Sequence, residues 1–340
     1  MILVVTEAGD RTANQVIDRL LARGAEVARF NPADFPSRAS ISITLDAKGR
    51  RAVTLIHAGA KIDLHRLDAL WYRRPQGPVP HDEIADEAVR RYLEAECAHH
   101  LWDVWNLLDC RIVPATPSVI ARADLKAAQL AMAGSVGFEL PPTLVSNDPD
   151  EFLDFCQRHQ GKVISKAPGP SFNGHFANQV ARYTEPVARR ELGHAQSIRF
   201  GPVIFQAYVP KRIELRITVV GRQVFAAEIH SQASKRARHD WRHYDLANTP
   251  HARHTLPSEV ERCCVRLVQQ LGLCYGAIDM VLTPQGRYVF LEINPNGQYQ
   301  WIEQLTGLPI SEAICDLLMA PNPERPRATP VQADCIGATA

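Results

Sequence analysis

The sequence predicts a mixed α/β protein, in which an open α/β unit precedes a unit built on antiparallel strands. Residues 1–6 are apolar, residues 11–24 have helical periodicity, and residues 25–30 return to a strand-like pattern. This β-α-β order is typical of an open α/β unit. Strand-like runs dominate residues 203–229, and residues 277–293 have the pattern of a hairpin. Short connections between such strands favour an antiparallel sheet in the C-terminal part.

The N-terminal α/β domain is expected to span residues 1–117. No glycine-rich loop follows its first strand, so it lacks the fingerprint of a dinucleotide-binding fold. A proline-rich break at residues 75–80 separates its later strands from a long amphipathic helix. The expected strands and this helix cover residues 41–45, 52–56, 69–74, 83–108 and 112–114.

Three regions follow this boundary. They are a small central domain, a C-terminal domain and a disordered tail, over residues 118–205, 206–320 and 321–340. The periodicity predicts one helix from Ser118 to about Ala133, and Asn147 or Asp148 is the expected N-cap of the next helix. Further helices and strands are expected over residues 143–146, 149–159, 162–166, 257–272 and 307–319.

The composition is that of an ordinary globular protein, with 46% hydrophobic and 22% charged residues in a chain of 340. A net charge of +1 provides no global field for nucleic acid or an anionic membrane, so neither is an expected partner. No apolar run approaches the roughly 20 residues that cross a bilayer, and the N-terminus lacks the basic segment of a signal peptide. The eight cysteines contain no C-x-x-C pair, which favours reduced thiols in a cytoplasmic protein.

The most informative pattern is the hairpin at residues 277–293. Turn-favouring residues occupy positions 283–286, and symmetric closure there pairs Asp279 with Phe290. Directly paired residues share one face of a sheet, so each face can be assigned. The expected core face carries Ile278, Met280, Leu282, Val289 and Leu291.

The opposite face of this hairpin predicts a magnesium site. It carries Asp279, Phe290, Glu292 and Asn294. Asp279 and Glu292 become diagonal neighbours, about 7–8 Å apart at the backbone. Mg²⁺ prefers oxygen ligands and completes its shell with water and phosphate. The alternative is a half-exposed hairpin whose acidic residues are incidental.

A second hairpin precedes the first along the chain. A three-residue turn at residues 221–223 keeps its apolar residues on one face and puts Glu228 opposite Arg216. The polar face then carries Glu214, Arg216 and Glu228, whereas a two-residue turn would place Glu228 against Leu215. An exposed sheet face with cross-strand ion pairs is the alternative interpretation.

Cationic residues lie near segments suited to anions. Lys126 lies on the helix that begins at Ser118, and Lys166 ends a strand just before a Gly/Pro/Ser loop at residues 167–174. Backbone N–H groups of such a loop can cradle an anion. Residues 235–244 are basic and aromatic, which suits an anion or a peptide carboxylate. Taken alone, each lysine is also consistent with a solvated side chain.

The order of these features resembles the ATP-grasp ligases over residues 115–310. A helix lysine is followed by a strand-end lysine, a hinge strand, an acid-x-Arg strand, an Arg-containing loop, a carboxylate strand and a Glu-x-Asn strand. Four stretches narrow the resemblance to the ATP-grasp peptide maturases, the macrocyclases of microviridin-type graspetides. They are WYRRP at 71–75, YVPKRIELRITVVG at 208–221, SQASKRARHDWRHYD at 231–245 and EINPNGQYQWIEQLTGLPI at 292–310.

The resemblance implies an ATP-grasp fold with a pre-ATP-grasp N-terminal domain, and it implies residues that bind the nucleotide. Lys126 and Lys166 resemble the two lysines that bind its phosphates. Tyr208 and Val209 fall on the hinge whose backbone holds adenine. Glu214 matches the acid that holds the ribose.

One hinge position departs from the family pattern. Many ATP-grasp hinges carry Glu where this chain has Ala207. The resemblance therefore implies that Gln206 or Lys211 supplies the missing side-chain contact.

The resemblance also implies the groups that surround the reacting atoms. Arg216 and Arg242 match basic residues near the transferred phosphate and the acceptor carboxylate. Asp279, Glu292 and Asn294 match the metal ligands.

The activity implied by the resemblance is an ATP-dependent carboxylate–hydroxyl or carboxylate–amine ligation. Asp or Glu side chains of a ribosomal precursor peptide are phosphorylated by ATP with Mg²⁺ and joined to Ser/Thr hydroxyls or Lys amines, as ω-esters or ω-amides. The implied partner is a precursor with a leader and a core rich in Thr/Ser and Asp/Glu, and a homodimer is left open. Two alternatives stand beside it: another ATP-grasp ligase, similar to glutathione synthetase or the ligase that glutamylates a ribosomal protein, and a non-catalytic protein that binds ATP or a leader.

Overall fold

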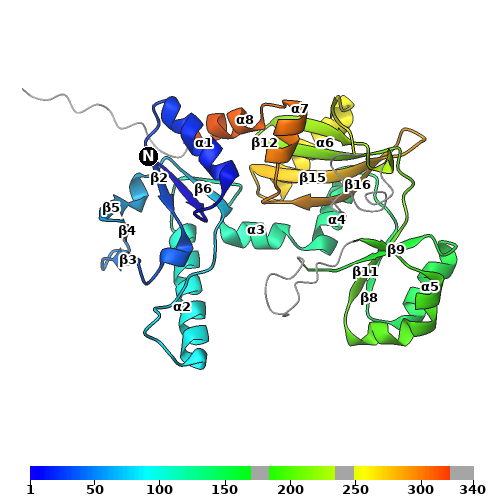
Figure 1. Ribbon diagram of the computed structural model, residues 1–340, viewed down its shortest axis with the longest axis horizontal. Helices are drawn as coiled ribbons and strands as arrows, with labels where there is room; N and C mark the ends of the chain where they lie inside the picture. Colours follow the sequence, from blue (N-terminus) through cyan, green and yellow to red (C-terminus); the bar gives the residue numbers. More distant parts are fainter. Residues whose placement is uncertain (170–183, 234–248, 322–340) are drawn as a thin grey trace, which may run out of the picture.

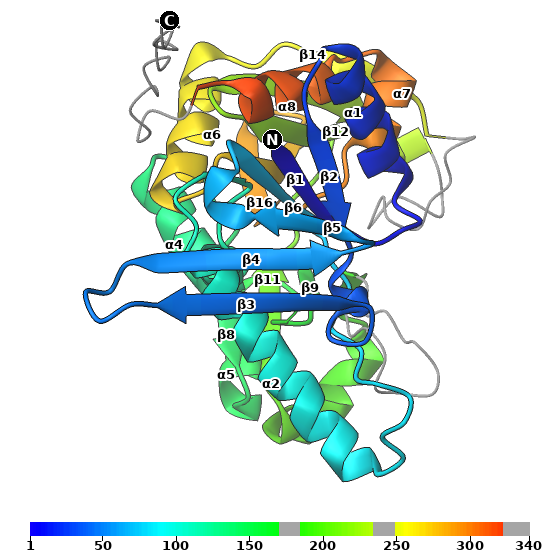
Figure 2. The same ribbon diagram turned by 90° about the vertical axis from the view of Figure 1, so that its left-hand side faces the viewer.

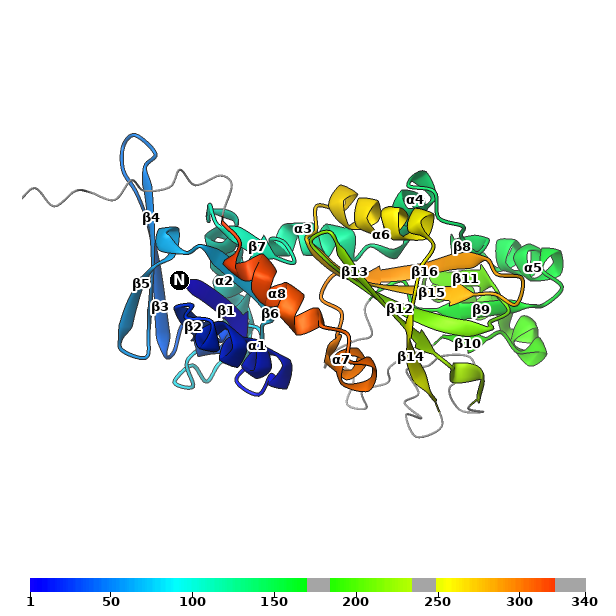
Figure 3. The same cartoon turned by 90° about the horizontal axis from the view of Figure 1, so that it is seen from above.

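A computed structural model describes residues 1–169, 184–233 and 249–321 of the chain (Figure 1). The mixed α/β fold predicted from the sequence is confirmed, with four sheets in the described part. Viewed from above, the N-terminal elements, the five-stranded sheet and the unit with β8, β9 and β11 follow one another along the long axis (Figure 3). The domain boundaries stay predictions, since no observation divides the chain at particular residues.

The N-terminal sheet is parallel, in the strand order β2-β1-β6-β7. Strand β1 of this sheet is buried on both faces. Leu3 and Val5 pack toward helix α2, while Ile2 and Val4 pack toward helices α1 and α8. Helix α8 comes from the C-terminus, so the two ends of the chain share one core. The bounds are β1 (Ile2–Thr6), α1 (Arg11–Ala22), β2 (Val27–Phe30), β6 (Ala69–Arg74), α2 (Glu87–Asn106), β7 (Arg111–Val113) and α8 (Ile310–Met319).

A separate antiparallel sheet contains β3 (Ala39–Leu45), β4 (Arg51–His57) and β5 (Ala60–Asp63). Figure 2 shows β3 and β4 crossing in front of α2. The sequence predicted the first two strands, but β5 is short and polar and was missed. Short 3₁₀ helices occur at η1 (Pro32–Asp34), η2 (Leu64–Arg66) and η4 (Ser231–Ala233).

The single helix predicted from Ser118 to Ala133 is wrong, because the chain forms two helices there. They are α3 (Pro117–Ala123) and α4 (Lys126–Ser135), with Leu125 in an extended conformation between them. The carbonyl of Ala123 accepts a hydrogen bond from buried Gln129 Nε2 at 2.7 Å, and the same nitrogen donates to Ile293 O at 2.8 Å. This side-chain contact satisfies a carbonyl at the helix end, and periodicity alone carries no sign of it.

The small central sheet has the strand order β10-β9-β11-β8, with antiparallel pairs. Helix α5 packs on it through Phe152 and Phe155, and Asp148 is its N-cap, which confirms one of the two predicted caps. The elements are β8 (Thr143–Ser146), α5 (Pro149–Arg158), β9 (Val163–Lys166), β10 (Glu185–Pro186), η3 (Arg189–Phe200) and β11 (Val203–Ala207).

The C-terminal sheet is antiparallel, in the order β14-β13-β12-β15-β16. One of its faces packs against α4 and α6 around a core that includes Ile217, Ile278 and Phe290. The other face carries the polar residues considered below. The elements are β12 (Ile213–Val220), β13 (Gln223–Ile229), β14 (His251–His254), α6 (Ser258–Gln270), β15 (Tyr275–Leu282), β16 (Tyr288–Asn294) and α7 (Gln300–Thr306).

The register predicted for the β15–β16 hairpin is wrong. Asp279 pairs directly with Glu292, and Met280 pairs with Phe290, so Leu291 is an extra residue in a β-bulge. The bulge places Phe290 in the core, where it stacks on Phe138 at 5.3 Å between ring centroids, and turns Leu291 to the polar face. The turn also differs from the prediction, because it pairs Leu282 with Tyr288 rather than with Arg287. A symmetric four-residue turn therefore missed one shift at the turn and a second shift at the bulge.

The register predicted for the β12–β13 hairpin is also wrong. Leu215 pairs with Glu228 and Arg216 with Ala227, which is the two-residue turn rejected from the apolar pattern. Gly221, with φ of 60°, takes the first central position of this turn, where glycine is favoured. Every residue of β12 is buried, so alternation did not separate a core face from an exposed one. Glu228 consequently lies away from Arg216.

In the described residues, no helix is both long enough and apolar enough to span a bilayer.

Candidate functional site

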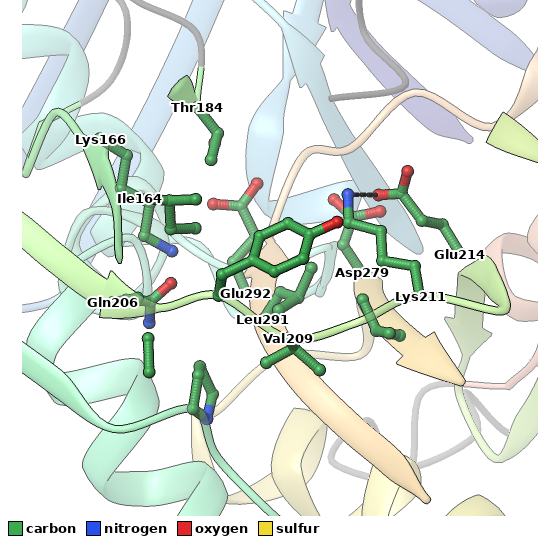
Figure 4. A pocket seen from close by; sticks show the side chains of 14 residues that line it. Ile164, Lys166, Thr184, Gln206, Val209, Lys211, Glu214, Asp279, Leu291 and Glu292 are labelled. Carbon is green, nitrogen blue, oxygen red and sulfur yellow. Dashed lines mark ion pairs between the residues drawn. The ribbon is translucent and has the colours of Figure 1, made fainter. Parts of the chain in front are cut away.

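A pocket lies between the small central sheet and the polar face of the five-stranded sheet (Figure 4). Strands β9 and β11 provide one wall, and β12, β15 and β16 provide the other. Figure 4 shows Lys166 and Gln206 across from Glu214 and Asp279. The pocket is lined by eight of the residues predicted from the sequence: Lys166, Gln206, Tyr208, Val209, Lys211, Glu214, Asp279 and Glu292.

The predicted metal ligands lie together at one end of this pocket. Asn294 Nδ2 donates to Asp279 Oδ2 at 3.2 Å and lies 3.4 Å from Glu292 Oε1. Lys126 Nζ lies 3.5 Å from Glu292 Oε2, so the helix lysine reaches the same end. Two carboxylates and an amide oxygen form a hard donor set that suits Mg²⁺. The residues present therefore fit a magnesium ion, and their role as ligands stays a prediction.

Arg216 is the counter-ion of Asp279. Its Nη1 donates to both carboxylate oxygens at 2.9 Å, and its Nη2 donates to Gln298 O at 3.1 Å. The side chain is buried, with 4% of its surface exposed. A buried guanidinium held on two sides has a fixed position beside the metal-ligand candidates.

Glu214 occupies another part of the pocket wall. Its Oε2 lies 3.1 Å from Lys211 Nζ, and its Oε1 accepts from Ser231 Oγ at 2.6 Å. The carboxylate is thus held by a cation and a hydroxyl, which orients it. Lys211 is paired with Glu214 in this structure, and its compensation for Ala207 stays a prediction.

Gln206 lies at the hinge end of the pocket and is 1% exposed. Its Nε2 donates to Thr143 Oγ1 at 2.9 Å, and Thr143 Oγ1 donates to Pro141 O at 2.8 Å. Because a carbonyl only accepts, the hydroxyl proton is committed to Pro141, and Thr143 must accept from the amide nitrogen. Gln206 Oε1 is buried and has no hydrogen-bond partner in the described residues. An orphan acceptor of this kind favours a ligand that donates.

Two N–H groups of the hinge backbone form hydrogen bonds within the protein. Ala207 N–H donates to Pro142 O at 2.9 Å, and Tyr208 N–H donates to Lys162 O at 2.8 Å. These two bonds fix the backbone where β11 ends. This part of the pocket wall therefore has its shape before a ligand binds.

Some predicted residues lie outside the described part of the chain. They are Arg242, all of the stretch 235–244, residues 170–174 of the predicted loop and residues 322–340 of the predicted tail. Other residues contact the site but were missed by sequence reasoning. Thr143, Ser231 and Gln298 bind Gln206, Glu214 and Arg216, respectively, and no local pattern marks them.

Comparison with known proteins gives a consistent result. A family model, the MvdD pre-ATP grasp domain, matches residues 1–118. No curated protein matches the chain. A Chryseobacterium gregarium RiPP-associated ATP-grasp ligase, solved with ADP and a leader and core peptide, is 32% identical, with a TM-score of 0.84 over 93% of this chain and 96% of that chain.

Two macrocyclases of Microcystis aeruginosa MRC are also similar. MdnC, solved with its precursor peptide MdnA, is 29% identical, with a TM-score of 0.81 over 93% of this chain and 98% of that chain. MdnB is 30% identical, with a TM-score of 0.76 over 94% of this chain and 98% of that chain. The similarity covers 93–94% of this chain in all three cases. The chain therefore belongs to the family of RiPP-associated ATP-grasp ligases.

Proposed function

We propose that this protein uses ATP to phosphorylate Asp or Glu side chains of a ribosomal precursor peptide and then forms intramolecular ω-ester or ω-amide crosslinks, releasing ADP and phosphate. The observation that carries the proposal is that Asn294, Lys126 and Arg216 converge on Asp279 and Glu292, two carboxylates that line the pocket. A carboxylate becomes a useful electrophile only as an acyl phosphate, and phosphoryl transfer depends mainly on positioning and charge neutralisation.

The carboxylates, the amide and the two lysines around the pocket each have a role in the proposal. Asp279, Glu292 and Asn294 hold Mg²⁺, which neutralises phosphate charge when it is bound. Lys126 and Lys166 offset negative charge on the phosphates. These side chains come from separate helices and strands, so folding places them before the nucleotide arrives.

The acceptor side of the reaction involves the two arginines. Arg216 is fixed by Asp279 and Gln298 O, and it orients the acceptor carboxylate or the transferred phosphate. We assign the same region to Arg242 from the family pattern. The attacking group is a Ser/Thr hydroxyl or a Lys amine of the peptide itself.

The proposed partner is a precursor peptide with a leader and a core rich in Thr/Ser and Asp/Glu. The Chryseobacterium relative was solved with a leader and core peptide, and MdnC from Microcystis was solved with a precursor peptide, which supports this choice. Because the reaction consumes ATP, we propose a cytoplasmic location.

Mass spectrometry tests the activity. The protein is incubated with Mg²⁺, ATP and a precursor encoded beside it, and each new ring lowers the mass of the peptide by one water. Tandem fragmentation then locates the crosslinked residues. ATP hydrolysis with an unchanged peptide mass contradicts the macrocyclisation proposal, and addition of a free amino acid favours the alternative ligase.

Gln206 is proposed to recognise adenine. Its orphan Oε1 accepts from the 6-amino group of adenine, whereas the 6-oxo group of guanine offers no proton. Since Thr143 fixes the amide orientation, Thr143→Val lets the amide nitrogen turn toward the pocket. We expect this variant to lower the ratio of kcat/KM for ATP over GTP about tenfold, which corresponds to one hydrogen bond of roughly 1.4 kcal/mol.

Two further variants define this experiment. Gln206→Leu removes the acceptor, so the KM for ATP rises while little discrimination against GTP remains. Ser146→Ala is the matched control, because Ser146 lies on the same strand as Thr143 but bonds to Glu151 Oε2. A wild-type ATP/GTP ratio in both Thr143→Val and Gln206→Leu contradicts the assignment.

A further inference from the structure

The loop of residues 295–298 joins the candidate metal site to the N-terminal sheet. It directly follows Asn294 at the end of β16, and Gly297 N–H donates back to Asn294 O at 3.1 Å. The carbonyl of Gln298 accepts from Arg216 Nη2 at 3.1 Å. A displacement of this loop therefore moves both a predicted metal ligand and the acceptor-side arginine.

The same loop is bound on its other side by the carboxyl end of β6. One end of the Asn296 side-chain amide faces two carbonyl oxygens, Tyr72 O and Arg73 O. Because carbonyls only accept, we assign the amide nitrogen to this end, where it donates to each of them at 3.1 Å. Arg73 Nη1 in turn donates to Asn296 O at 3.4 Å. Two residues separated by 223 positions thus exchange hydrogen bonds in both directions.

Arg73 is a buried cation whose hydrogen bonds are incomplete. Its side chain is 3% exposed, and its Nε lacks a hydrogen-bond partner in the described residues. Asp10 Oδ2 lies 3.6 Å from Arg73 Nε, and the Asp10 carboxylate already accepts from Ala13 N–H and Thr6 Oγ1. A buried, incompletely paired guanidinium is weak evidence for stability, because an apolar residue of similar size often serves as well. Its contact with Asn296 points instead to placement of the loop.

The loop has no room to shift toward Arg216. A Cβ atom on Gly297 would lie 2.4 Å from Ala277 Cβ and 2.7 Å from Arg216 Nη2. Tyr275 Oη donates to Gly297 O at 2.5 Å, and burial raises the pKa of this tyrosine to about 12, so the hydroxyl keeps its proton near neutral pH. The loop is therefore held between β15 and β6.

We propose that Arg73 and Asn296 are positioning residues for the ligation reaction. They fasten the 295–298 loop to β6 and thereby fix Asn294 and Arg216 at the pocket. Neither residue lines the pocket, so they act through the loop. Arg73 is the third residue of the WYRRP stretch. The contact with Asn296 gives this residue of the stretch a structural role. Only the expected kinetic effects of this inference depend on the proposed function.

The test compares the full-length protein with Asn296→Ala and Arg73→Lys. Asn296→Ala removes the bonds to the two β6 carbonyls, and Arg73→Lys keeps the charge but loses the planar donor group. We expect the Mg²⁺ concentration for half-maximal rate to rise about tenfold, as it does when outer partners of metal ligands are removed. We also expect kcat to fall, while the KM for precursor and the Kd of ADP without Mg²⁺ stay within about twofold of wild type.

A second measurement does not depend on activity. Hydrogen–deuterium exchange in the absence of nucleotide and metal should be about tenfold faster in residues 294–299 of Asn296→Ala, because the loop opens more often. Asn31→Ala is the matched control: Asn31 lies near the same end of the sheet and bonds to Gln76 Oε1 at 2.9 Å. Its exchange in residues 294–299 and its Mg²⁺ dependence should equal those of wild type.

The outcomes separate the two proposals. Unchanged exchange and unchanged Mg²⁺ dependence in Asn296→Ala overturn the positioning role. An equal loss of metal-free ADP binding also overturns it, because the defect would then be general. If the wild-type protein makes no dehydrated peptide, the proposed function fails, while the exchange measurement still decides whether Arg73 and Asn296 hold the loop.

Discussion

Replacing Glu292 with Gln is expected to abolish dehydration of the precursor. Glu292 Oε2 lies 3.5 Å from Lys126 Nζ, and Glu292 Oε1 lies 3.4 Å from Asn294 Nδ2, so the substitution removes the charge at the centre of the donor set. We expect kcat for ring formation to fall by a factor of about 10³ or more, because electrostatic stabilisation of phosphoryl transfer depends on this charge. Mass spectrometry of the peptide and release of ADP measure the loss.

Binding of the precursor should persist in this variant, because Gln has the same shape and the lost charge acts on the nucleotide and metal. Fluorescence anisotropy of a labelled precursor gives its Kd. Glu139→Gln is the control, since Glu139 is a surface residue that pairs with Arg287 outside the pocket. Wild-type turnover in Glu292→Gln would remove Glu292 from the metal site.

Replacing Arg216 with Ala is expected to impair ligation far more than nucleotide binding. The substitution removes the two bonds to Asp279 and the bond to Gln298 O. The acceptor region then loses its fixed cation, and we expect kcat to fall at least about 100-fold. Isothermal titration with ADP should show a Kd within about fivefold of wild type, since the hinge wall of the pocket is untouched.

Stability must be measured beside activity for this residue. Removing one partner of a buried ion pair costs about 3–5 kcal/mol, so Arg216→Ala should also lower the Tm. Arg216→Lys keeps the charge but cannot reach both Asp279 and the carbonyl with a rigid fork, so a smaller loss of Tm with a persistent loss of kcat is expected. Arg222→Ala, at the exposed turn of the same hairpin, is the control. A wild-type cyclisation rate in Arg216→Lys and Arg216→Ala would exclude Arg216 from the site.

The two hairpins show which features of a sheet the sequence pattern predicts and which it does not. Alternation correctly indicated strands and placed Asp279, Glu292 and Asn294 on a common face. It gave the wrong partner for Asp279 because the turn pairs Leu282 with Tyr288 rather than with Arg287, and the bulge at Leu291 then shifts the register by one further residue. It gave the wrong partner for Glu228 because β12 is buried on both faces, and the alternation of apolar and polar residues then no longer selects a register.

The interior contacts of the site were beyond sequence reasoning. Gln206 was named for the hinge, but the orientation of its amide depends on Thr143, which lies 63 positions away. The break before Lys126 depends on Gln129 reaching both Ala123 O and Ile293 O. Such contacts join segments that are distant in the chain, and periodicity describes neighbours only.

The sequence by itself determined the mixed α/β class, most of the strands and helices, and the acidic and basic residues that gather at the pocket. These follow from local periodicity and from the order of chemical groups along the chain, both of which can be read without coordinates. The tertiary structure decided the registers of both hairpins, the orphan oxygen of Gln206 and the bonds between Arg73 and Asn296. Each of these depends on which distant surfaces meet in the folded core, where packing and hydrogen-bond satisfaction override local preference.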